Sequence, residues 1–160
     1  MPKLPNPIHL LVFDFDGVLT DNRVWVFEDG REAVACNRGD GMGMQMVRDA
    51  GVPVLVLSKE KNPVVGARCK KIGIECIQGI DDKPARLTQF CSERKYDLKH
   101  VIYMGNDIND LECMKLVGYA VAPADAEKSI LKIANLITKR KGGRGAVRDL
   151  CDLILKKLKK

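Results

Sequence analysis

The chain has 160 residues, of which 46% are hydrophobic and 30% charged, and its formal net charge is +6. This is the balance of a soluble globular protein, and the length suggests one domain, residues 1–160. Its apolar runs are shorter than the roughly 18 residues that a membrane span needs, and the first residues contain no apolar leader segment. We therefore expect a cytoplasmic protein without a membrane partner.

The six cysteines are scattered, with no CxxC pair and no clustered Cys/His spacing. They are expected to be reduced thiols that act as small hydrophobic residues. Basic residues gather at residues 139–144 and 156–160. Such charge could favour nucleic acid, but only 5% of the residues are aromatic and no base-stacking platform is visible. We interpret these groups as solvated helix ends and expect no nucleic-acid partner.

The first half of the chain predicts two buried strands, a hairpin and a helix. Residues 9–15 form an apolar run typical of a buried strand, and residues 52–57 form a second. Residues 24–27 and 32–36 flank Asp29-Gly30, a strong hairpin signal. Residues 42–50 have helical spacing that stops at Gly51, and residues 37–41 before them are expected to be a loop.

The second half continues the alternation of helix and strand. Helices are predicted from Asn62-Pro63 to Gly73 and over residues 82–95, 110–117, 125–137 and 146–158. Strands are predicted over residues 75–78, 101–104 and 119–122. This alternation indicates an α/β fold with a mainly parallel sheet.

Polar residues follow the predicted strands, where ligands of parallel sheets bind. Asp14 and Asp16 follow the first strand, Ser58 follows the second and Lys83 comes after the third. The fourth strand is followed by Gly105-Asn106-Asp107-Ile108-Asn109-Asp110. These residues are expected to converge on one edge of the sheet.

Each of these residue types has a task in phosphoryl transfer. Asp14 can attack phosphorus and form an acyl phosphate. Asp16 can protonate the leaving oxygen if the backbone turns after the strand, which Gly17 permits. Ser58 and Lys83 can bind the phosphoryl oxygens, and Asp110 can hold Lys83.

Carboxylates and phosphate repel each other unless a cation lies between them. Mg²⁺ takes oxygen ligands and keeps several waters, so Asp14 with Asn106 or Asp107 would suffice. The backbone carbonyl of Asp16 could also face the ion. Each of these motifs is weak alone, but their combination in this order at strand ends is a strong signal.

The segments DFDGVLTD (residues 14–21), LVLS (55–58), Lys83 and GNDIND (105–110) resemble the four motifs of the haloacid dehalogenase-like phosphatases. The resemblance implies a three-layer α/β/α, Rossmann-like fold, with Asp14 as the nucleophile and Asp16 as the acid/base. It also implies phosphate binding by Ser58 and Lys83. Asp14, Asp16, Asn106 and Asp107 would be the metal positions, with Asp110 in support.

About 40 residues separate Asp16 from Ser58, less than a cap domain usually needs, so the chain resembles a capless member. The hairpin, the loop at residues 37–41 and the tail GGRGAVRD (142–149) resemble the subgroup that acts on phosphorylated 2-keto-3-deoxy sugar acids of eight or nine carbons. That subgroup forms tetramers in which a neighbouring subunit helps to close the active site. The resemblance therefore implies a phosphorylated sugar acid and further copies of this chain as partners.

Within the subgroup, Glu60, Arg68 and Lys71 match positions that contact the sugar acid in neuraminate-type enzymes. This match favours a nine-carbon substrate, with 3-deoxy-manno-octulosonate 8-phosphate next. Arg38 and Asp40, in a glycine-flanked segment, are further candidates for substrate binding, with ordinary turn residues as the alternative.

One position departs from the family pattern. Its acidic loop usually begins Gly-Asp, but Asn106 stands at the acid's place. An amide oxygen coordinates a cation without contributing charge, so weaker metal affinity or a larger role for Asp107 is expected. Two other functions stay open at this stage: a signalling receiver that only holds phosphate on Asp14, and a non-catalytic oligomerisation module of a sialic acid synthetase.

Overall fold

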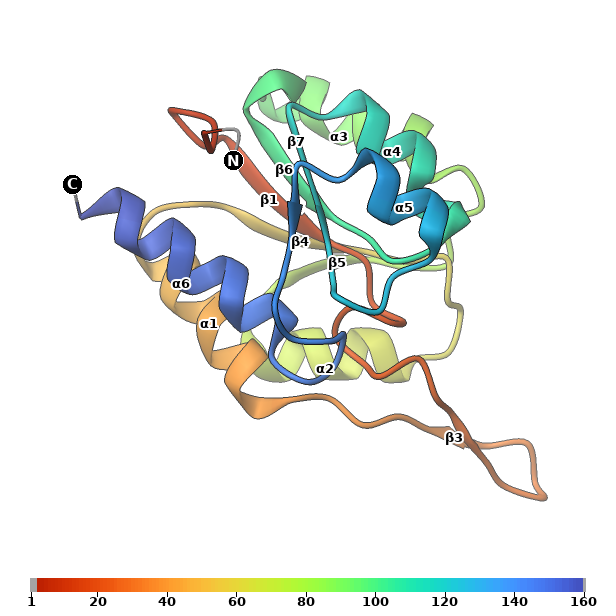
Figure 1. Cartoon of the computed structure of the whole chain (residues 1–160). Coiled ribbons are helices and arrows are strands. Elements are labelled where there is room, and N and C mark those ends of the chain that lie inside the picture. Colours follow the sequence, from red (N-terminus) through yellow and green to blue (C-terminus); the bar gives the residue numbers. More distant parts are fainter. Residues whose placement is uncertain (1–2, 160) are drawn as a thin grey trace.

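The structure is a computed structural model and describes residues 3–159. Within these residues, six short strands form one parallel sheet in the order β5-β4-β1-β6-β7-β8 (Figure 1). They are β1 (Leu10–Phe13), β4 (Val54–Leu57), β5 (Glu75–Ile77), β6 (Val101–Met104), β7 (Tyr119–Ala122) and β8 (Leu136–Ile137). Central β1 pairs with both neighbours, so Phe13 lies beside Val56 and Met104. The parallel sheet predicted from the sequence is confirmed.

Helices cover both faces of the sheet and give the predicted three layers (Figure 1). One face carries α1 (Arg38–Asp49), α2 (Val64–Ile72) and α6 (Ala146–Leu158). The other carries α3 (Lys83–Arg94), α4 (Leu111–Leu116) and α5 (Lys128–Ile133). Two short 3₁₀ turns, η1 (Leu98–His100) and η2 (Ile108–Asp110), precede β6 and α4. Among the described residues, no helix has the length and apolarity that crossing a membrane requires.

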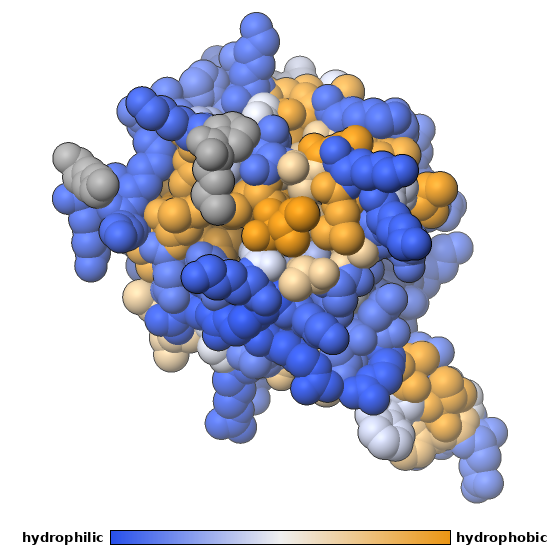
Figure 2. Space-filling view, viewed as in Figure 1, coloured by the Kyte–Doolittle hydropathy of each residue, from blue (hydrophilic) through white to orange (hydrophobic). Residues whose placement is uncertain are grey.

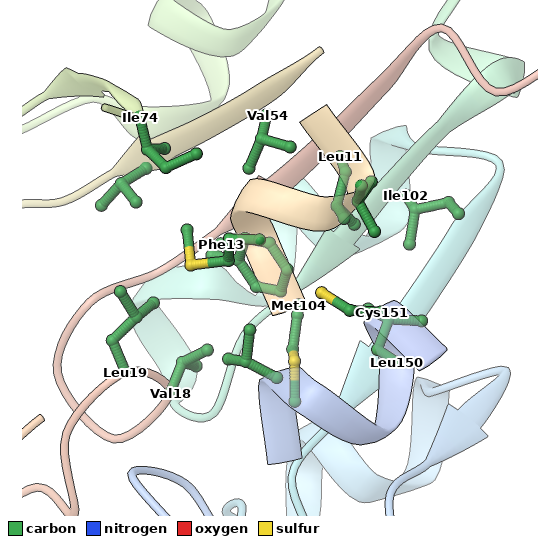
Figure 3. Close-up of a cluster of buried hydrophobic side chains, with 14 of the residues drawn as sticks. Leu11, Phe13, Val18, Leu19, Val54, Ile74, Ile102, Met104, Leu150 and Cys151 are labelled. Carbon is green, nitrogen blue, oxygen red and sulfur yellow. The ribbon is translucent and has the colours of Figure 1, made fainter. Parts of the chain in front are cut away.

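The core fixes the position of β1. Because side chains alternate along a strand, Leu11 and Phe13 pack toward α1 and α6, whereas Leu10 and Val12 pack toward α3. Figure 3 shows Phe13 among buried side chains from several elements, including Cys151. Burying each such side chain contributes about 1.5–3 kcal/mol. The end of β1, where Asp14 follows, is therefore held firmly on both faces.

The segment between Asp16 and α1 is a projecting hairpin of β2 (Trp25–Val26) and β3 (Glu32–Ala33). Gly30 has φ +82°, which the turn requires, and Phe27 accepts the N–H of Gly30 at 2.9 Å. Between Asp16 and Ser58 the chain forms only this hairpin, α1 and the sheet strand β4, so no cap domain is present there. Apolar side chains stay exposed on the hairpin, at the lower right of Figure 2, and Trp25 is 71% exposed.

Two sequence predictions are wrong. The helix expected over residues 125–137 is only α5, and β8 follows it, because Asn135 pairs with Ala120 through both its N–H and its side-chain oxygen. The sequence predicts a loop over residues 37–41, but Asn37 caps α1 by accepting the N–H of Asp40, and residues 38–41 form the first turn of that helix. Hydrogen bonds thus override the apolar pattern in the first case and the glycine-rich composition in the second.

Candidate active site

The strand ends bring the predicted residues together at one edge of the sheet. Asp14 directly follows β1 and Ser58 directly follows β4, while Asn106 lies just beyond β6. They surround a cavity of about 610 Å³. Its lining consists of Asp14, Asp16, Asn22, Ser58, Lys59, Glu60, Lys61, Asn106, Asp107, Ile108 and Asn109. Six of the site residues predicted from the sequence therefore line this cavity. Lys83 does not line it, but its ammonium contacts Asp14, which does.

Asp14 is fixed by its backbone and its side chain. Its N–H donates to the carbonyl of Met104 at 3.0 Å, and its Oδ1 accepts from Nζ of Lys83 at 2.8 Å. The residue is only 3% exposed. Burial and the nearby carboxylate of Asp110 raise the pKa of Asp14 to about 7, although Lys83 counteracts this shift. The group is thus a rigid carboxylate at the floor of the cavity.

Lys83 is a buried cation between two carboxylates. It stands at the start of α3, where Asp82 caps the helix by accepting the N–H of Ala85. Its Nζ donates to Asp14 and also to Oδ1 of Asp110, at 2.7 Å. Burial alone would lower the pKa of Lys83, but the two carboxylates outweigh it and raise that pKa. Lys83 is therefore charged where it meets Asp14.

Asp110 connects Lys83 to the loop that follows β6. Its Oδ1 accepts from Lys83 and from the hydroxyl of Tyr103 at 2.8 Å, while its Oδ2 accepts the backbone N–H of Asn106 at 3.0 Å. Sequence reasoning missed Tyr103. The signal was present, because a tyrosine within a buried strand needs a partner for its hydroxyl. The N–H of Asp107 makes a longer hydrogen bond to Oδ2 of Asp110 at 3.4 Å. Four hydrogen bonds thus hold the Asp110 carboxylate in place.

Asp16 reaches the cavity because the backbone turns immediately after it. Gly17 has φ +79°, and a Cβ there would overlap the amide of Asn106. Burial raises the pKa of Asp16, and the negative charges of Glu60 and Glu32 raise it further. Within residues 3–159 the Asp16 carboxylate has no hydrogen-bond donor. Its direction is therefore set by the backbone around it.

The loop after β6 offers oxygen atoms that suit a divalent cation. Oδ1 of Asn106 is buried and has no hydrogen-bond partner among the described residues, although it borders the cavity. Buried polar atoms are normally satisfied, so this oxygen points to a missing ligand. Asp107 also lines the cavity, and its side chain accepts the N–H of Ile108 at 2.6 Å. Asp14, Asn106 and Asp107 together fit an oxygen-preferring ion.

The donor set is poor in acidic side chains. Within residues 3–159, no three His, Cys, Asp or Glu side chains are grouped so that they could hold a metal ion. A cation here would depend on amide, carbonyl and water oxygens in addition to carboxylates. This is the way in which Mg²⁺ is commonly bound, because it retains several waters.

Ser58 and Glu60 form one side of the cavity. Ser58 is buried, and its Oγ accepts the N–H of Glu60 at 3.1 Å. Oε1 of Glu60 accepts the N–H of Asn62 at 2.7 Å, and Nδ2 of Asn62 donates to Glu32 on the hairpin at 3.3 Å. Glu60 thus lies in the same cavity as Asp14 and is linked to the hairpin through Asn62.

The remaining predicted substrate contacts lie elsewhere in this chain. Arg38, Arg68 and Lys71 line a second cavity of about 330 Å³ between α1 and α2, which shares no lining residue with the first. Asp40 lines neither cavity. Its carboxylate is buried and accepts backbone N–H groups at the start of α6. The glycine-flanked loop expected to carry Asp40 to the substrate is a helical turn instead.

Comparisons with known proteins agree with this geometry. A family model described as haloacid dehalogenase-like hydrolase matches residues 59–149. The 3-deoxy-D-manno-octulosonate 8-phosphate phosphatase of Escherichia coli (strain B / BL21-DE3) is 35% identical over 156 residues, which cover 97% of this chain and 82% of that protein.

Solved structures show the same fold. The Moraxella catarrhalis 3-deoxy-D-manno-octulosonate 8-phosphate phosphatase, crystallised with magnesium, phosphate and the sugar acid, superposes with a TM-score of 0.90 at 32% identity, covering 93% of this chain and 86% of that one. The cobalt-bound phosphatase from Haemophilus influenzae gives a TM-score of 0.90 at 28% identity, with 96% and 90% covered. Fold, site and relatives agree: the chain belongs to the haloacid dehalogenase-like hydrolases, as a capless phosphoric monoester hydrolase of that family.

Proposed function

We propose that this chain is a Mg²⁺-dependent phosphatase that removes phosphate from a 2-keto-3-deoxy sugar acid through a phosphoaspartate on Asp14. The observation that carries this proposal is the contact of Asp14 with Lys83 beside the unpaired oxygen of Asn106. An anionic nucleophile, a fixed cation and a free oxygen ligand are the parts that phosphoryl transfer to a carboxylate needs.

Each residue has one task in this mechanism. Asp14 attacks phosphorus, the bond from phosphorus to the leaving oxygen breaks, and Asp16 protonates that oxygen. Asp16 then accepts a proton from the water that hydrolyses the acyl phosphate. Ser58 and Lys83 bind the phosphoryl oxygens, whose negative charge grows in the transition state.

The cation site would be formed by Asp14, Asn106 and Asp107, with the backbone carbonyl of Asp16 as a further oxygen donor. When bound, Mg²⁺ would neutralise the repulsion between the Asp14 carboxylate and the phosphate. The nearby positive charge would also favour the ionised form of Asp14, which the attack requires.

The sequence alone favours a nine-carbon acid, but the names of the relatives support 3-deoxy-D-manno-octulosonate 8-phosphate as the first candidate substrate. Glu60, which lies in the cavity of Asp14, supports a nine-carbon neuraminate-type acid as the second candidate. A phosphate-release assay with Mg²⁺ over both acids and common metabolite phosphates tests this point. The proposal is supported if the protein clearly prefers either acid phosphate and the Asp14→Asn variant does not cleave it. Equal rates over the whole panel would contradict the substrate class.

We also propose that the active form is a homotetramer in which a neighbouring subunit closes the site. The hairpin leaves Trp25 and Val26 exposed at 71% and 68%, an apolar surface that a second copy could cover. The cationic side chains of Arg68 and Lys71 lie outside the cavity of Asp14 in the same chain. If a neighbouring subunit supplied Arg68 and Lys71 to this cavity, they could bind the carboxylate of the substrate.

A mixing experiment tests this arrangement. Asp14→Asn subunits lack the nucleophile, and Arg68→Ala subunits lack a cation of the second cavity. If the cation acts on a neighbouring site, refolding the two inactive or weakened variants together restores part of the activity. A mixture no more active than the sum of its parts would contradict shared sites.

A further inference from the structure

The loop that carries Asp16, residues 15–21, is a compact turn that we call the acid loop. The carbonyl of Phe15 accepts the N–H groups of Leu19 at 2.9 Å and Thr20 at 3.2 Å. Oγ1 of Thr20 accepts the N–H of Gly17 at 3.1 Å. Since no described residue donates a hydrogen bond to the Asp16 carboxylate, its direction depends on the backbone of this loop.

A second backbone segment, residues 142–145, packs directly against the acid loop, and we call it the glycine segment. The N–H of Gly143 donates to the carbonyl of Val18 at 2.9 Å. A Cβ at position 142 would overlap the carbonyl oxygen of Gly17, and one at Gly143 would overlap the backbone of Thr20. Only glycine lets the two backbones approach this closely.

The glycine segment is itself anchored from two sides. The N–H of Gly142 donates to Oδ1 of Asp125 at 2.9 Å. At the other end, the two carboxylate oxygens of Asp40 accept the N–H groups of Gly145 at 3.2 Å and Arg148 at 2.8 Å. Asp40 is 2% exposed, so it caps the first turn of α6 from within the molecule. The acid loop therefore rests on a support fixed by two carboxylates.

We propose that the glycine segment and Asp40 position Asp16 for proton transfer to the leaving oxygen. This inference rests on the function proposed above and assigns a task to the glycine segment and to Asp40, which the site itself does not use. Neither the segment nor Asp40 touches the cavity of Asp14, so both act through the acid loop. The predicted contact of Asp40 with substrate is replaced by this role.

The proposal predicts an effect that depends on the leaving group. An alkoxide needs a proton as the bond to phosphorus breaks, whereas nitrophenolate leaves without one. Displacing Asp16 should therefore slow the cleavage of an alkyl phosphate far more than that of 4-nitrophenyl phosphate. Loss of folded protein or of the cation would slow both reactions alike. The quantity to compare is kcat/KM, which reports the formation of the acyl phosphate.

The test variant is Gly142→Ala, assayed with Mg²⁺ on 3-deoxy-D-manno-octulosonate 8-phosphate and on 4-nitrophenyl phosphate. The methyl group pushes on Gly17, and Gly142 does not have a positive φ that would add strain of its own. We expect kcat/KM to fall roughly 10- to 100-fold on the sugar acid phosphate and less than about threefold on the aryl phosphate. The control is Gly51→Ala, which strains a residue at φ +90° without touching the acid loop. It should lower stability and leave the ratio of the two kcat/KM values unchanged.

Asp40→Asn is the second variant, in case Gly142→Ala does not fold. It keeps the side-chain volume and weakens the hydrogen bond that anchors Gly145. The ratio of the two kcat/KM values should therefore shift in the same direction as in Gly142→Ala, but by less. Equal losses on both substrates, or no loss in either variant, would overturn the inference while the proposed function stood. If the wild-type protein cleaved neither substrate, the proposed function would fail, and this inference with it.

Discussion

The ammonium of Lys83 lies 2.8 Å from Oδ1 of Asp14, although the two residues are 69 positions apart in the sequence. Lys83 is 1% exposed and also donates to Asp110, so one buried cation pairs with two buried carboxylates. Buried charges are tolerated when they are paired and hydrogen-bonded. This contact joins the end of β1 to the start of α3 and holds the proposed nucleophile in place.

Replacing Lys83 by methionine should destabilise the fold. The change leaves Asp14 and Asp110 buried without a counter-charge, which is expected to lower the free energy of unfolding by about 3–5 kcal/mol. Urea unfolding measures this loss. Lys115→Met is the matched control, because Lys115 pairs with Glu112 on the surface, with the two side chains 52% and 64% exposed. It should change stability by less than about 1 kcal/mol. Equal stabilities of the two variants would contradict the role given to Lys83.

Tyr103→Phe removes one hydrogen bond from the Asp110 carboxylate and leaves the ring in the core. The free energy of unfolding should fall by about 1–3 kcal/mol, because Asp110 is fully buried and no water replaces the hydroxyl. Thermal unfolding checks the stability and a phosphate-release assay the turnover, which should fall several-fold. Tyr96→Phe is the control, since the Tyr96 hydroxyl makes no hydrogen bond within residues 3–159. A Tyr103→Phe protein as stable as this control would show that Asp110 does not depend on Tyr103.

Asn106→Asp should strengthen metal binding. It places a full negative charge where the wild-type chain has an unpaired amide oxygen. The Mg²⁺ concentration at half-maximal activity is expected to fall roughly tenfold, as for one added charge near a divalent ion. Asp107→Asn removes a charge from the same loop and should raise that concentration. A chelator should abolish turnover in all three proteins. If the two substitutions shifted the Mg²⁺ requirement in the same direction, the cation site assigned to this loop would be wrong.

Trp25→Glu tests the proposed use of the exposed hairpin. If the proposed tetramer forms through this apolar surface, a charge there should convert it to smaller species in sedimentation velocity and lower activity in proportion. Glu28→Ala, in the same hairpin, serves as the control and should leave the assembly unchanged. A Trp25→Glu protein that sediments like the wild type would rule the hairpin out as the subunit contact.

Most of the sheet and the centre of the site could be predicted from the sequence. Asp14, Ser58 and Asn106 follow short apolar runs, and parallel strands place the residues after them on one edge. The place of these residues directly after predicted strands was therefore enough to predict that they lie together, without any knowledge of side-chain contacts. The roles proposed for these residues stay predictions until variants are assayed.

The parts that could not be predicted depend on tertiary contacts. The apolar pattern of residues 125–137 suits a helix, but Asn135 pairs with Ala120 and turns the end of the segment into a strand. The residues around Asp40 have the composition of a loop. Its carboxylate nevertheless accepts a hydrogen bond from the start of α6, more than a hundred residues away in the sequence. Such partners become visible only when the fold brings them together.

The most direct test of the account is to find the phosphate on the protein during turnover. Wild-type protein is mixed with 3-deoxy-D-manno-octulosonate 8-phosphate and Mg²⁺, quenched in acid within milliseconds, digested and analysed by mass spectrometry. We predict a phosphorylated peptide that carries the modification on Asp14 and that forms and decays at rates consistent with turnover. Phosphate release without any such peptide, or with phosphate on another residue, would contradict the mechanism.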